Sequence, residues 1–360
     1  MKVAFRTDAS IQIGTGHVMR CLTLATELQQ RGHTCSFICR DHPGHLAELI
    51  ASKGFAVERL PPAAPDTETS DLNWNAHASW LGASWQQDAE QTRSLLQDQP
   101  VDWLVVDHYA LDARWEQALK LNYKKLMVID DLGDREHLAD LLLEQNYGST
   151  AEKYQGLVPD NCKILAGTQY ALLRPEFAQW REYSLKRRKN ISEINSILIT
   201  MGGVDPDNYT GKILEQLAKT ELNPKNKITV VMGATAPHLA TVKQQAAAMP
   251  VTTQVKANVS NMAELMSNAD LAIGAAGATT WERCCLGLPT IQLVIAENQR
   301  QIANALAKEN MIILLEKLEV LPSLVVEAKS RIDELSQLSA SSCDGKGSLR
   351  IGRIILEGEK

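Results

Sequence analysis

The sequence predicts an α/β protein made of two tandem Rossmann-like, doubly wound domains. The chain has 360 residues, too many for one ordinary core and enough for two domains of ~150–200 residues each. The same order of short apolar strand, glycine loop and amphipathic helix occurs in both halves. The strands do not alternate apolar and polar residues, which is typical of parallel sheets covered by helices on both faces.

The first occurrence of this pattern starts at the N-terminus. Residues 3–7 (VAFRT) predict a buried strand, and the loop after it carries Gly14 and Gly16. Apolar residues at helical spacing then predict an amphipathic helix through Leu28. Further strands are expected at 35–39 (CSFIC), 103–107 (WLVVD) and 126–130 (LMVID).

The second occurrence starts near residue 196. Residues 196–201 (SILITM) predict the strand, Gly202 and Gly203 the loop, and the apolar positions from Ile213 to Leu217 the helix. Further strands are expected at 228–232 (ITVVM), 270–274 (DLAIG) and 290–295 (TIQLVI).

These elements predict the domain boundaries. We expect an N-terminal domain at 1–160, a linker at 161–190, a C-terminal domain at 191–340, and a final helix at 341–360 that packs back toward the N-terminal domain. The basic run KRRKN (186–190) is interpreted as a solvated helix end rather than a nucleic-acid site.

Composition and charge limit the classes of partner. The chain is 44% hydrophobic and 22% charged, with a net charge of -6, which favours a soluble protein without general affinity for nucleic acid or anionic lipid. No stretch is apolar enough for a signal peptide or a membrane span. Seven cysteines without a CxxC pair indicate reduced thiols. We therefore expect a cytoplasmic protein with no nucleic-acid partner and no stable membrane association.

The segment GTGHVMRC (14–21) is the first candidate site. Ligands of open α/β sheets bind at the carboxyl ends of strands, and two such sheets can face each other across a cleft. Gly14 and Gly16 favour close approach to the backbone, and His17 adds a proton acceptor that can hold or deprotonate a water. The alternative is a tight strand–helix turn in which His17 has no chemical role.

The segment VVDHYALD (105–112) ends another expected strand at the same edge. Asp107 is a candidate to orient a histidine, and Tyr109 to donate a hydrogen bond to a sugar or a water. His108 is either part of this site or a surface turn residue.

Two further segments in the second half carry candidate ligand groups. In GAAGATTWERCC (274–285), Gly277, Thr279 and Thr280 suit a diphosphate and Glu282 suits ribose hydroxyls, although a threonine cap needs no ligand. In AENQ (296–299), the amides of Asn298 and Gln299 suit hydroxyl and acetamido groups.

Cofactor and metal motifs are absent from the sequence. The glycine spacing does not match the dinucleotide fingerprint, and no Walker A pattern occurs. The pair of histidines in HPGH (42–45) lacks a third ligand. We expect no cofactor and no metal.

The segments DASIQIGTGHVMRCLTLA, VVDHYALD, MGGVDPDN and GAAGATTWERCCLGLPTIQLVIAENQ resemble the UDP-2,4-diacetamido-2,4,6-trideoxy-β-L-altropyranose hydrolases of pseudaminic acid biosynthesis. That family lies within the glycosyltransferase-B superfamily, so the resemblance implies a GT-B fold. The similarity extends from residue 3 to about 300, except at 60–100, which we expect to be a variable insertion.

The resemblance implies a division of roles between the domains. It implies that the N-terminal domain carries the catalytic His17 and an active-site tyrosine, Tyr109, and that the C-terminal domain holds UDP, with Met262 near uracil and Glu282 on ribose. The full substrate-binding set is expected to be Arg6, Asp8, Gly14, Gly16, Gly203, Met262, Gly277, Thr279, Thr280, Glu282, Asn298 and Gln299.

The expected reaction is hydrolysis of the anomeric C–O bond of a UDP-sugar, with His17 acting on the water. Two alternatives keep the fold: a glycosyltransferase that passes the sugar to an alcohol or lipid, and a UDP-sugar-binding regulator without catalysis. UDP-sugar 2-epimerases share the architecture, but we expect them to carry more acids and histidines.

Overall fold

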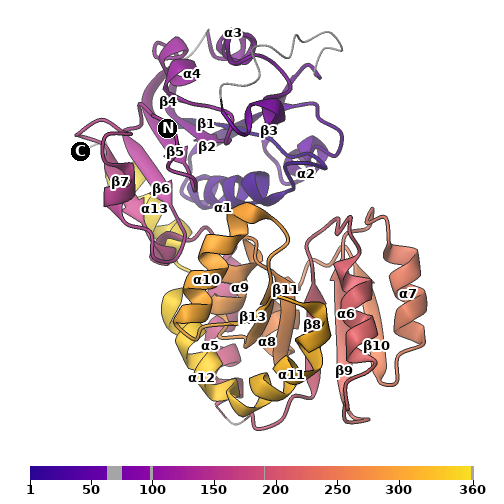
Figure 1. Ribbon diagram of the computed structural model, residues 1–360. Helices are drawn as coiled ribbons and strands as arrows, with labels where there is room; N and C mark the ends of the chain where they lie inside the picture. Colours follow the sequence, from indigo (N-terminus) through magenta and orange to yellow (C-terminus); the bar gives the residue numbers. More distant parts are fainter. Residues whose placement is uncertain (63–74, 98–99, 190, 358–360) are drawn as a thin grey trace. The chain divides into compact units, whose positions relative to one another are not determined.

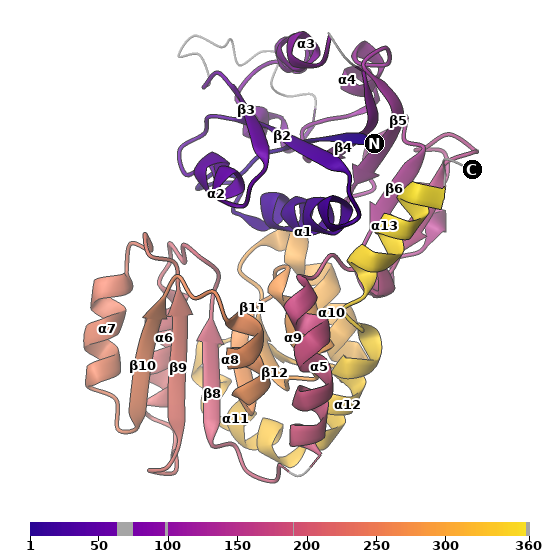
Figure 2. The same ribbon diagram turned by 180° about the vertical axis from the view of Figure 1, so that it is seen from behind.

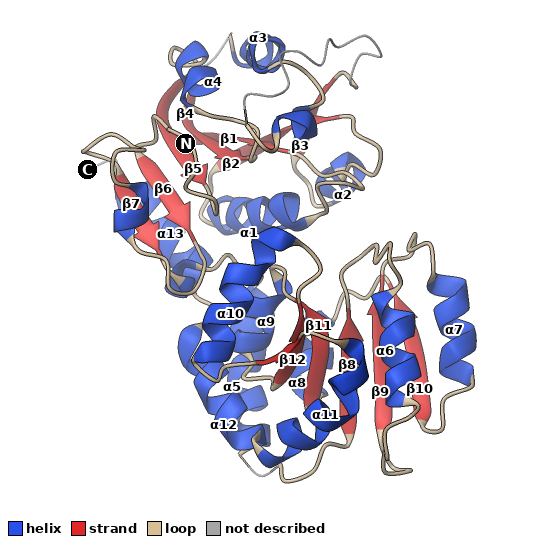
Figure 3. Cartoon of the chain, viewed as in Figure 1, coloured by secondary structure: helices blue, strands red, loops and turns tan. Residues whose placement is uncertain are grey.

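The computed structural model describes residues 1–62, 75–97, 100–189 and 191–357. The chain divides into two units, one of residues 1–172 with the chain from Ser348 onward, the other of Leu173–Gly347. Each unit is a parallel sheet with helices on both faces (Figures 1 and 3). The predicted fold class is confirmed.

The N-terminal sheet has seven strands in the order β3-β2-β1-β4-β5-β6-β7, and all neighbouring pairs are parallel. The strands are β1 (Lys2–Thr7), β2 (Thr34–Arg40), β3 (Ala56–Leu60), β4 (Val101–Asp107), β5 (Tyr123–Ile129), β6 (Leu141–Glu144) and β7 (Lys163–Ala166). The strand order reverses between β1 and β4, which makes this pair the switch point where doubly wound folds bind ligands.

Helices cover both faces of the N-terminal sheet. Its helices are α1 (Gly16–Gln30), α2 (Ala47–Ser52), η2 (Ala78–Leu81), α3 (Trp85–Leu96), α4 (Ala113–Ala118), η3 (Ala151–Tyr154), η4 (Thr168–Tyr170) and α13 (Gly347–Glu357). One core lies under α1, α2 and α13, and the other under α3 and α4 (Figure 1). Ile351 and Ile355 of α13 are completely buried in the first of these cores.

The C-terminal sheet has six parallel strands in the order β10-β9-β8-β11-β12-β13. They are β8 (Ser196–Thr200), β9 (Lys227–Met232), β10 (Thr252–Ala257), β11 (Leu271–Ala275), β12 (Thr290–Leu293) and β13 (Ile313–Leu315). The order again reverses between the first strand of the unit and its fourth, β8 and β11, so this sheet repeats the switch point of the first.

The helices of the C-terminal unit also form two layers. They are α5 (Pro175–Arg188), α6 (Tyr209–Leu217), α7 (Leu239–Ala247), α8 (Met262–Asn268), α9 (Thr279–Cys285), η5 (Glu297–Gln299), α10 (Arg300–Lys308), η6 (Leu318–Val320), α11 (Leu321–Ser330) and α12 (Ile332–Ser342). Figure 1 shows α6 and α11 on the near face of the sheet, and Figure 2 shows α5, α8 and α9 on the other.

Residues 161–190, expected as a linker, contain β7 of the first sheet and α5 of the second unit. The interpretation of KRRKN as a solvated helix end is wrong for Arg188, which is 3% exposed. Its guanidinium donates to the carbonyls of Met266, Ala269 and Leu286, so it ties α5 to the ends of α8 and α9. In the described part of the chain, no helix is both long and apolar enough to span a membrane.

Candidate functional site

The first candidate site lies at the switch point of the N-terminal sheet. Thr7 of β1 is in register with Asp107, the last residue of β4. The chain turns after β1 in a loop where the Ser10 carbonyl accepts from the Gly14 amide, and Gly14 adopts a φ of 79° that favours glycine. This turn starts α1 at Gly16 and places His17 in its first turn beside the end of β4.

His17 and Asp107 are hydrogen-bonded to each other. Nδ1 of His17 lies 2.6 Å from Oδ1 of Asp107. Because an ionised carboxylate only accepts hydrogen bonds, Nδ1 carries a proton, and in the neutral imidazole the lone pair is then on Nε2. Within the described residues, Nε2 of His17 has no hydrogen-bond partner. The pair can therefore present Nε2 as a base.

Arg20, one turn further along α1, keeps Asp107 in place and ionised. Its Nε and Nη2 bind the two oxygens of Asp107 at 2.6 and 2.7 Å, and its Nη1 binds Asp131 at 2.6 Å. Burial alone would raise the pKa of Asp107, but the charge of Arg20 and the hydrogen bonds from Arg20 and His17 outweigh burial and hold the pKa well below its usual range. Arg20 was not predicted from the sequence, although its spacing of three from His17 places both on one helix face.

Tyr109 lies beside the histidine and belongs to an aromatic group. Its ring centroid is 4.6 Å from that of His17, and its hydroxyl donates to Asp131 at 2.8 Å. Burial and the charge of Asp131 raise the pKa of Tyr109 well above its usual value, so the phenol stays protonated and acts as a donor. Trp80 stacks on Tyr109 at 5.7 Å, and His77 contacts both rings.

Trp80 and His77 come from the segment 60–100 that the sequence comparison suggested to be a variable insertion. The part of this segment that the structure describes contributes both rings to the surroundings of His17. The aromatic and histidine residues in NWNAHASW (73–80) are the only signal in the sequence that could have pointed to this role.

Arg6 and Asp8 lie under the site rather than in it. Both are 0% exposed, and the Arg6 guanidinium binds Asp8 at 2.7 Å and Asp88 of α3 at 2.7 Å. Asp88 also binds Arg40 of β2 at 2.7 Å. The expectation that Arg6 and Asp8 contact the substrate is therefore corrected: their charged groups are committed to a buried network that fixes the ends of β1 and β2.

His108 belongs to this buried network and is not a surface turn residue. It is 3% exposed. The Ala110 amide donates to Nδ1 of His108 at 3.0 Å, so the ring proton is on Nε2, which lies 3.2 Å from Oδ2 of Asp8. Among the described residues, no three His, Cys, Asp or Glu side chains gather in a way that could hold a metal ion.

The second candidate site lies at the switch point of the C-terminal sheet. Gly203 follows β8, and Gly277 follows the neighbouring strand β11. Thr279 begins α9, a helix of seven residues. The hydroxyl of Thr280 donates to Gln292 at 3.1 Å, and that of Thr279 accepts from Arg283 at 3.0 Å. Both hydroxyls thus have partners inside the protein.

Glu282 follows these threonines and is largely buried. Its carboxylate lies 3.5 Å from Nη2 of Arg174. Burial raises the pKa of Glu282 above its ordinary value, although Arg174 opposes the shift. A carboxylate held in this way can accept hydrogen bonds from sugar hydroxyls.

The other predicted residues of this unit lie on separate elements. Met262 is the first residue of α8 and is half-buried. Gln299 uses its side-chain oxygen to accept from the Ile295 amide at 3.1 Å. The side chain of Asn298 lies outside the described residues.

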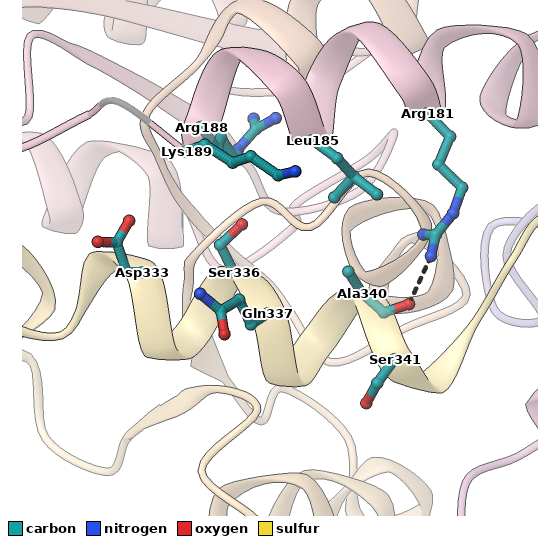
Figure 4. Close-up of a pocket in the computed structure, with 9 residues that line it drawn as sticks. All are labelled: Arg181, Leu185, Arg188, Lys189, Asp333, Ser336, Gln337, Ala340 and Ser341. Atoms are coloured by element: carbon teal, nitrogen blue, oxygen red, sulfur yellow. Dashed lines mark hydrogen bonds between the residues drawn. The ribbon is translucent and has the colours of Figure 1, made fainter.

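A groove of about 340 Å³ lies between α5 and α12, away from these residues (Figure 4). Leu185 and Ser336 face each other across it, and Arg181 donates to the Ala340 carbonyl at 2.8 Å. Its lining residues include none of those predicted from the sequence.

Two tandem Rossmann-like units, each with a candidate site at its switch point, define a protein of the GT-B fold. The crystal structure of MurG from Acinetobacter baumannii matches with a TM-score of 0.70 at 17% identity, covering 99% of each chain. The UDP-GlcNAc 2-epimerase from Neisseria meningitidis bound to UDP-GlcNAc matches with a TM-score of 0.63 at 14% identity, covering 99% of this chain and all of the other. These likenesses establish the fold.

Sequence comparisons point to more particular relatives. Residues 196–343 match the glycosyltransferase family 28 C-terminal domain. The UDP-2,4-diacetamido-2,4,6-trideoxy-beta-L-altropyranose hydrolase of Campylobacter jejuni is 27% identical over 310 residues, which cover 86% of this chain and 97% of the relative. The spore coat polysaccharide biosynthesis protein SpsG of Bacillus subtilis is 25% identical, covering 99% of this chain and 98% of the relative. The resemblance seen in the sequence motifs is confirmed.

Proposed function

We propose that this protein hydrolyses the anomeric C–O bond of a UDP-activated 2,4-diacetamido-2,4,6-trideoxy sugar, releasing UDP and the free sugar for pseudaminic acid biosynthesis. The observation that carries the proposal is the His17–Asp107 pair, in which Nε2 of a buried, oriented histidine is left to act as a base. The similarity to the Campylobacter jejuni hydrolase over most of both chains supports the choice of substrate.

The N-terminal unit supplies the reacting groups in this proposal. Nε2 of His17 takes a proton from water while the water oxygen bonds to C1 of the sugar. The C1–O bond breaks, and its electron pair stays on the terminal phosphate oxygen of UDP. Asp107 stabilises the positive charge that forms on His17, and Tyr109 and Trp80 form the aromatic surroundings of the sugar.

The C-terminal unit supplies the groups for UDP. Met262 contacts uracil, Glu282 accepts from the ribose hydroxyls, and backbone amides at Gly203 and Gly277 bind the diphosphate. Thr279 donates to the diphosphate through its backbone amide and its hydroxyl, which in the protein only accepts from Arg283. Thr280 acts by shaping the turn, because its hydroxyl donates to Gln292 and its amide to the Gly277 carbonyl. The backbone at Gly14 and Gly16 and the side-chain nitrogen of Gln299 complete the substrate contacts.

The proposal is tested by incubating the purified protein with UDP-diacetamido sugars in ¹⁸O-water and following the anomeric proton by NMR. Label in the sugar and none in UDP shows hydrolysis at C1, whereas label in UDP shows attack at phosphorus. His17→Leu removes the base, so turnover is expected to fall roughly 10²–10⁴-fold. Retention of most activity by His17→Leu excludes the base role.

A glycosyltransferase is the second candidate, because residues 196–343 match a glycosyltransferase domain. Such an enzyme needs an acceptor, so UDP release from the sugar nucleotide in water alone argues against it. A binding protein without catalysis releases no UDP under any of these conditions.

A further inference from the structure

Arg283 is a buried cation placed under the loop that the proposed function assigns to the diphosphate. The residue is 1% exposed and lies in α9. A Cβ on Gly274 would lie 2.6 Å from Nη1 of Arg283. Glycine at the end of β11 therefore leaves the space that the guanidinium fills.

The guanidinium is bound only to neutral oxygens. Nη1 donates to Thr279 at 3.0 Å, and Nη2 donates to the Ala275 carbonyl at 2.8 Å, to Thr280 at 3.2 Å and to Gln292 at 3.0 Å. Nε is buried without a hydrogen-bond partner. Three of these four acceptors belong to residues 275–280, so Arg283 holds the backbone and the hydroxyls of this loop together.

No carboxylate forms an ion pair with Arg283 within the part of the chain that the structure describes, and Glu282 attracts it only beyond ion-pair distance. The adjacent Glu282 is paired with Arg174. The buried arginines of the N-terminal unit differ in this respect: Arg6 and Arg40 bind Asp88, and Arg20 binds Asp107. Burying a charge without an ion-pair partner raises the free energy of the folded state. The missing partner of Arg283 therefore calls for a physical reason.

Arg188 is a second buried arginine of the C-terminal unit, and its charge is stabilised differently. It is also buried without a carboxylate, and burial lowers its pKa to about 9. Its donors bind carbonyls at the ends of α8 and α9, where the helix dipoles supply partial negative charge. Arg283 has no such set of helix-end carbonyls, and its neighbours at 279 and 280 stand at the start of a helix.

We propose that Arg283 is a positioning residue whose charge is the internal counter-charge of a nucleoside diphosphate bound at residues 275–280. The guanidinium does not touch the ligand. It fixes the loop at residues 275–280 and supplies positive charge from inside the protein. The bound anion neutralises this charge. This inference rests on the proposed function, since it requires that the C-terminal unit binds UDP. Burial lowers the pKa of Arg283 only to about 10, so the group stays charged at neutral pH.

The charge of Arg283 predicts how affinity depends on ligand charge. Calorimetry or ligand-observed NMR on the full chain with uridine, UMP and UDP measures this directly. In Arg283→Met, UDP affinity is expected to fall roughly tenfold or more, UMP affinity less, and uridine affinity to stay within about twofold. Arg283→Lys keeps the charge and is expected to retain most of the preference for UDP over uridine.

Two further variants separate charge from structure. Arg283→Gln keeps hydrogen-bonding capacity without charge, so it is expected to lose the UDP preference as Arg283→Met does, even where the methionine variant folds poorly. Arg188→Met removes another buried arginine, which binds the carbonyl at the opposite end of α9, and is expected to leave the ratio of UDP to uridine affinity unchanged.

The outcomes distinguish this inference from the proposed function. If the uncharged variants bind all three ligands with equally reduced affinity, or with unchanged affinity, Arg283 does not have the proposed role. UDP binding by the unaltered protein still supports the proposed nucleotide site in that case. Failure of the unaltered protein to bind any of the three ligands overturns both.

Discussion

Nδ1 of His17 lies 2.6 Å from Oδ1 of Asp107, although the two residues are 90 positions apart in the chain. The contact exists because β1 and β4 are neighbours, with Thr7 in register with Asp107. Arg20 binds both oxygens of the same carboxylate. The carboxylate is thereby fixed in position by one helix that also carries the histidine.

Asp107→Asn is expected to lower kcat roughly 10²–10⁴-fold in the proposed hydrolysis. The amide carries no charge to stabilise a protonated His17 and no longer enforces the proton on Nδ1. KM is expected to change little because Asp107 is 0% exposed. Steady-state kinetics checks this, with Asp112→Asn as a control because asparagine also caps α4. An unchanged kcat contradicts the role of Asp107.

Trp80→Ala is expected to lower kcat/KM roughly tenfold, since it removes a ring stacked on Tyr109 near His17. Trp80→Phe is expected to restore most of this loss. Kinetics on the purified variants measures the effect, with Trp180→Ala on α5 as a control that leaves kcat/KM unchanged. If Trp80 only packs against its neighbours, Trp80→Ala lowers the free energy of unfolding and leaves kcat/KM unchanged.

Asp88→Asn is expected to reduce the free energy of unfolding by about 3–5 kcal/mol, because it leaves Arg6 and Arg40 buried with too little negative charge. Denaturant unfolding measures the loss. Glu90→Gln on the same helix is the matched control, since this exposed residue pairs only with Arg93 at the surface and is expected to change stability by less than about 0.5 kcal/mol.

The effect of Asp88→Asn is also expected to depend on pH. Burial opposes ionisation of Asp88, but Arg6 and Arg40 outweigh it and lower its pKa. A lowered folded-state pKa means that the stabilisation is present above the unfolded pKa of ~3.9 and is lost as pH falls through the folded value. The difference between the two proteins should be constant at neutral pH and shrink below about pH 4. A difference that persists in strong acid contradicts this assignment.

Glu282→Ala is expected to weaken binding of UDP roughly tenfold and to leave binding of 2′,3′-dideoxy-UDP unchanged, because the carboxylate is proposed to accept from the ribose hydroxyls. Calorimetry compares the two ligands. Glu176→Gln is the control, because Glu176 also pairs with Arg174, at 3.0 Å. Equal weakening of both ligands indicates that Glu282 acts only through Arg174.

The sequence alone determined the two doubly wound units and the edges where their candidate sites lie. Continuous apolar runs such as 103–107 and 126–130 predict buried parallel strands, because a strand covered on both faces has no polar side. Polar residues at the ends of such runs, as Asp107 is, or in the loop and first helical turn after one, as His17 is after 3–7, then belong to the ligand-binding edge. The short strands β6 and β13 were not predicted, and neither were β3 and β10, which lie at the sheet edges and have no continuous apolar run.

The tertiary structure decided which side chains meet and which are buried. It paired His17 with Asp107, brought Trp80 to Tyr109 from a segment without family resemblance, and moved Arg6 from the expected ligand contacts into a buried ion network. It also placed Arg283 under its loop, where no carboxylate of the described chain forms an ion pair with it. These relationships join positions far apart in sequence or depend on burial, and local periodicity holds no information about either.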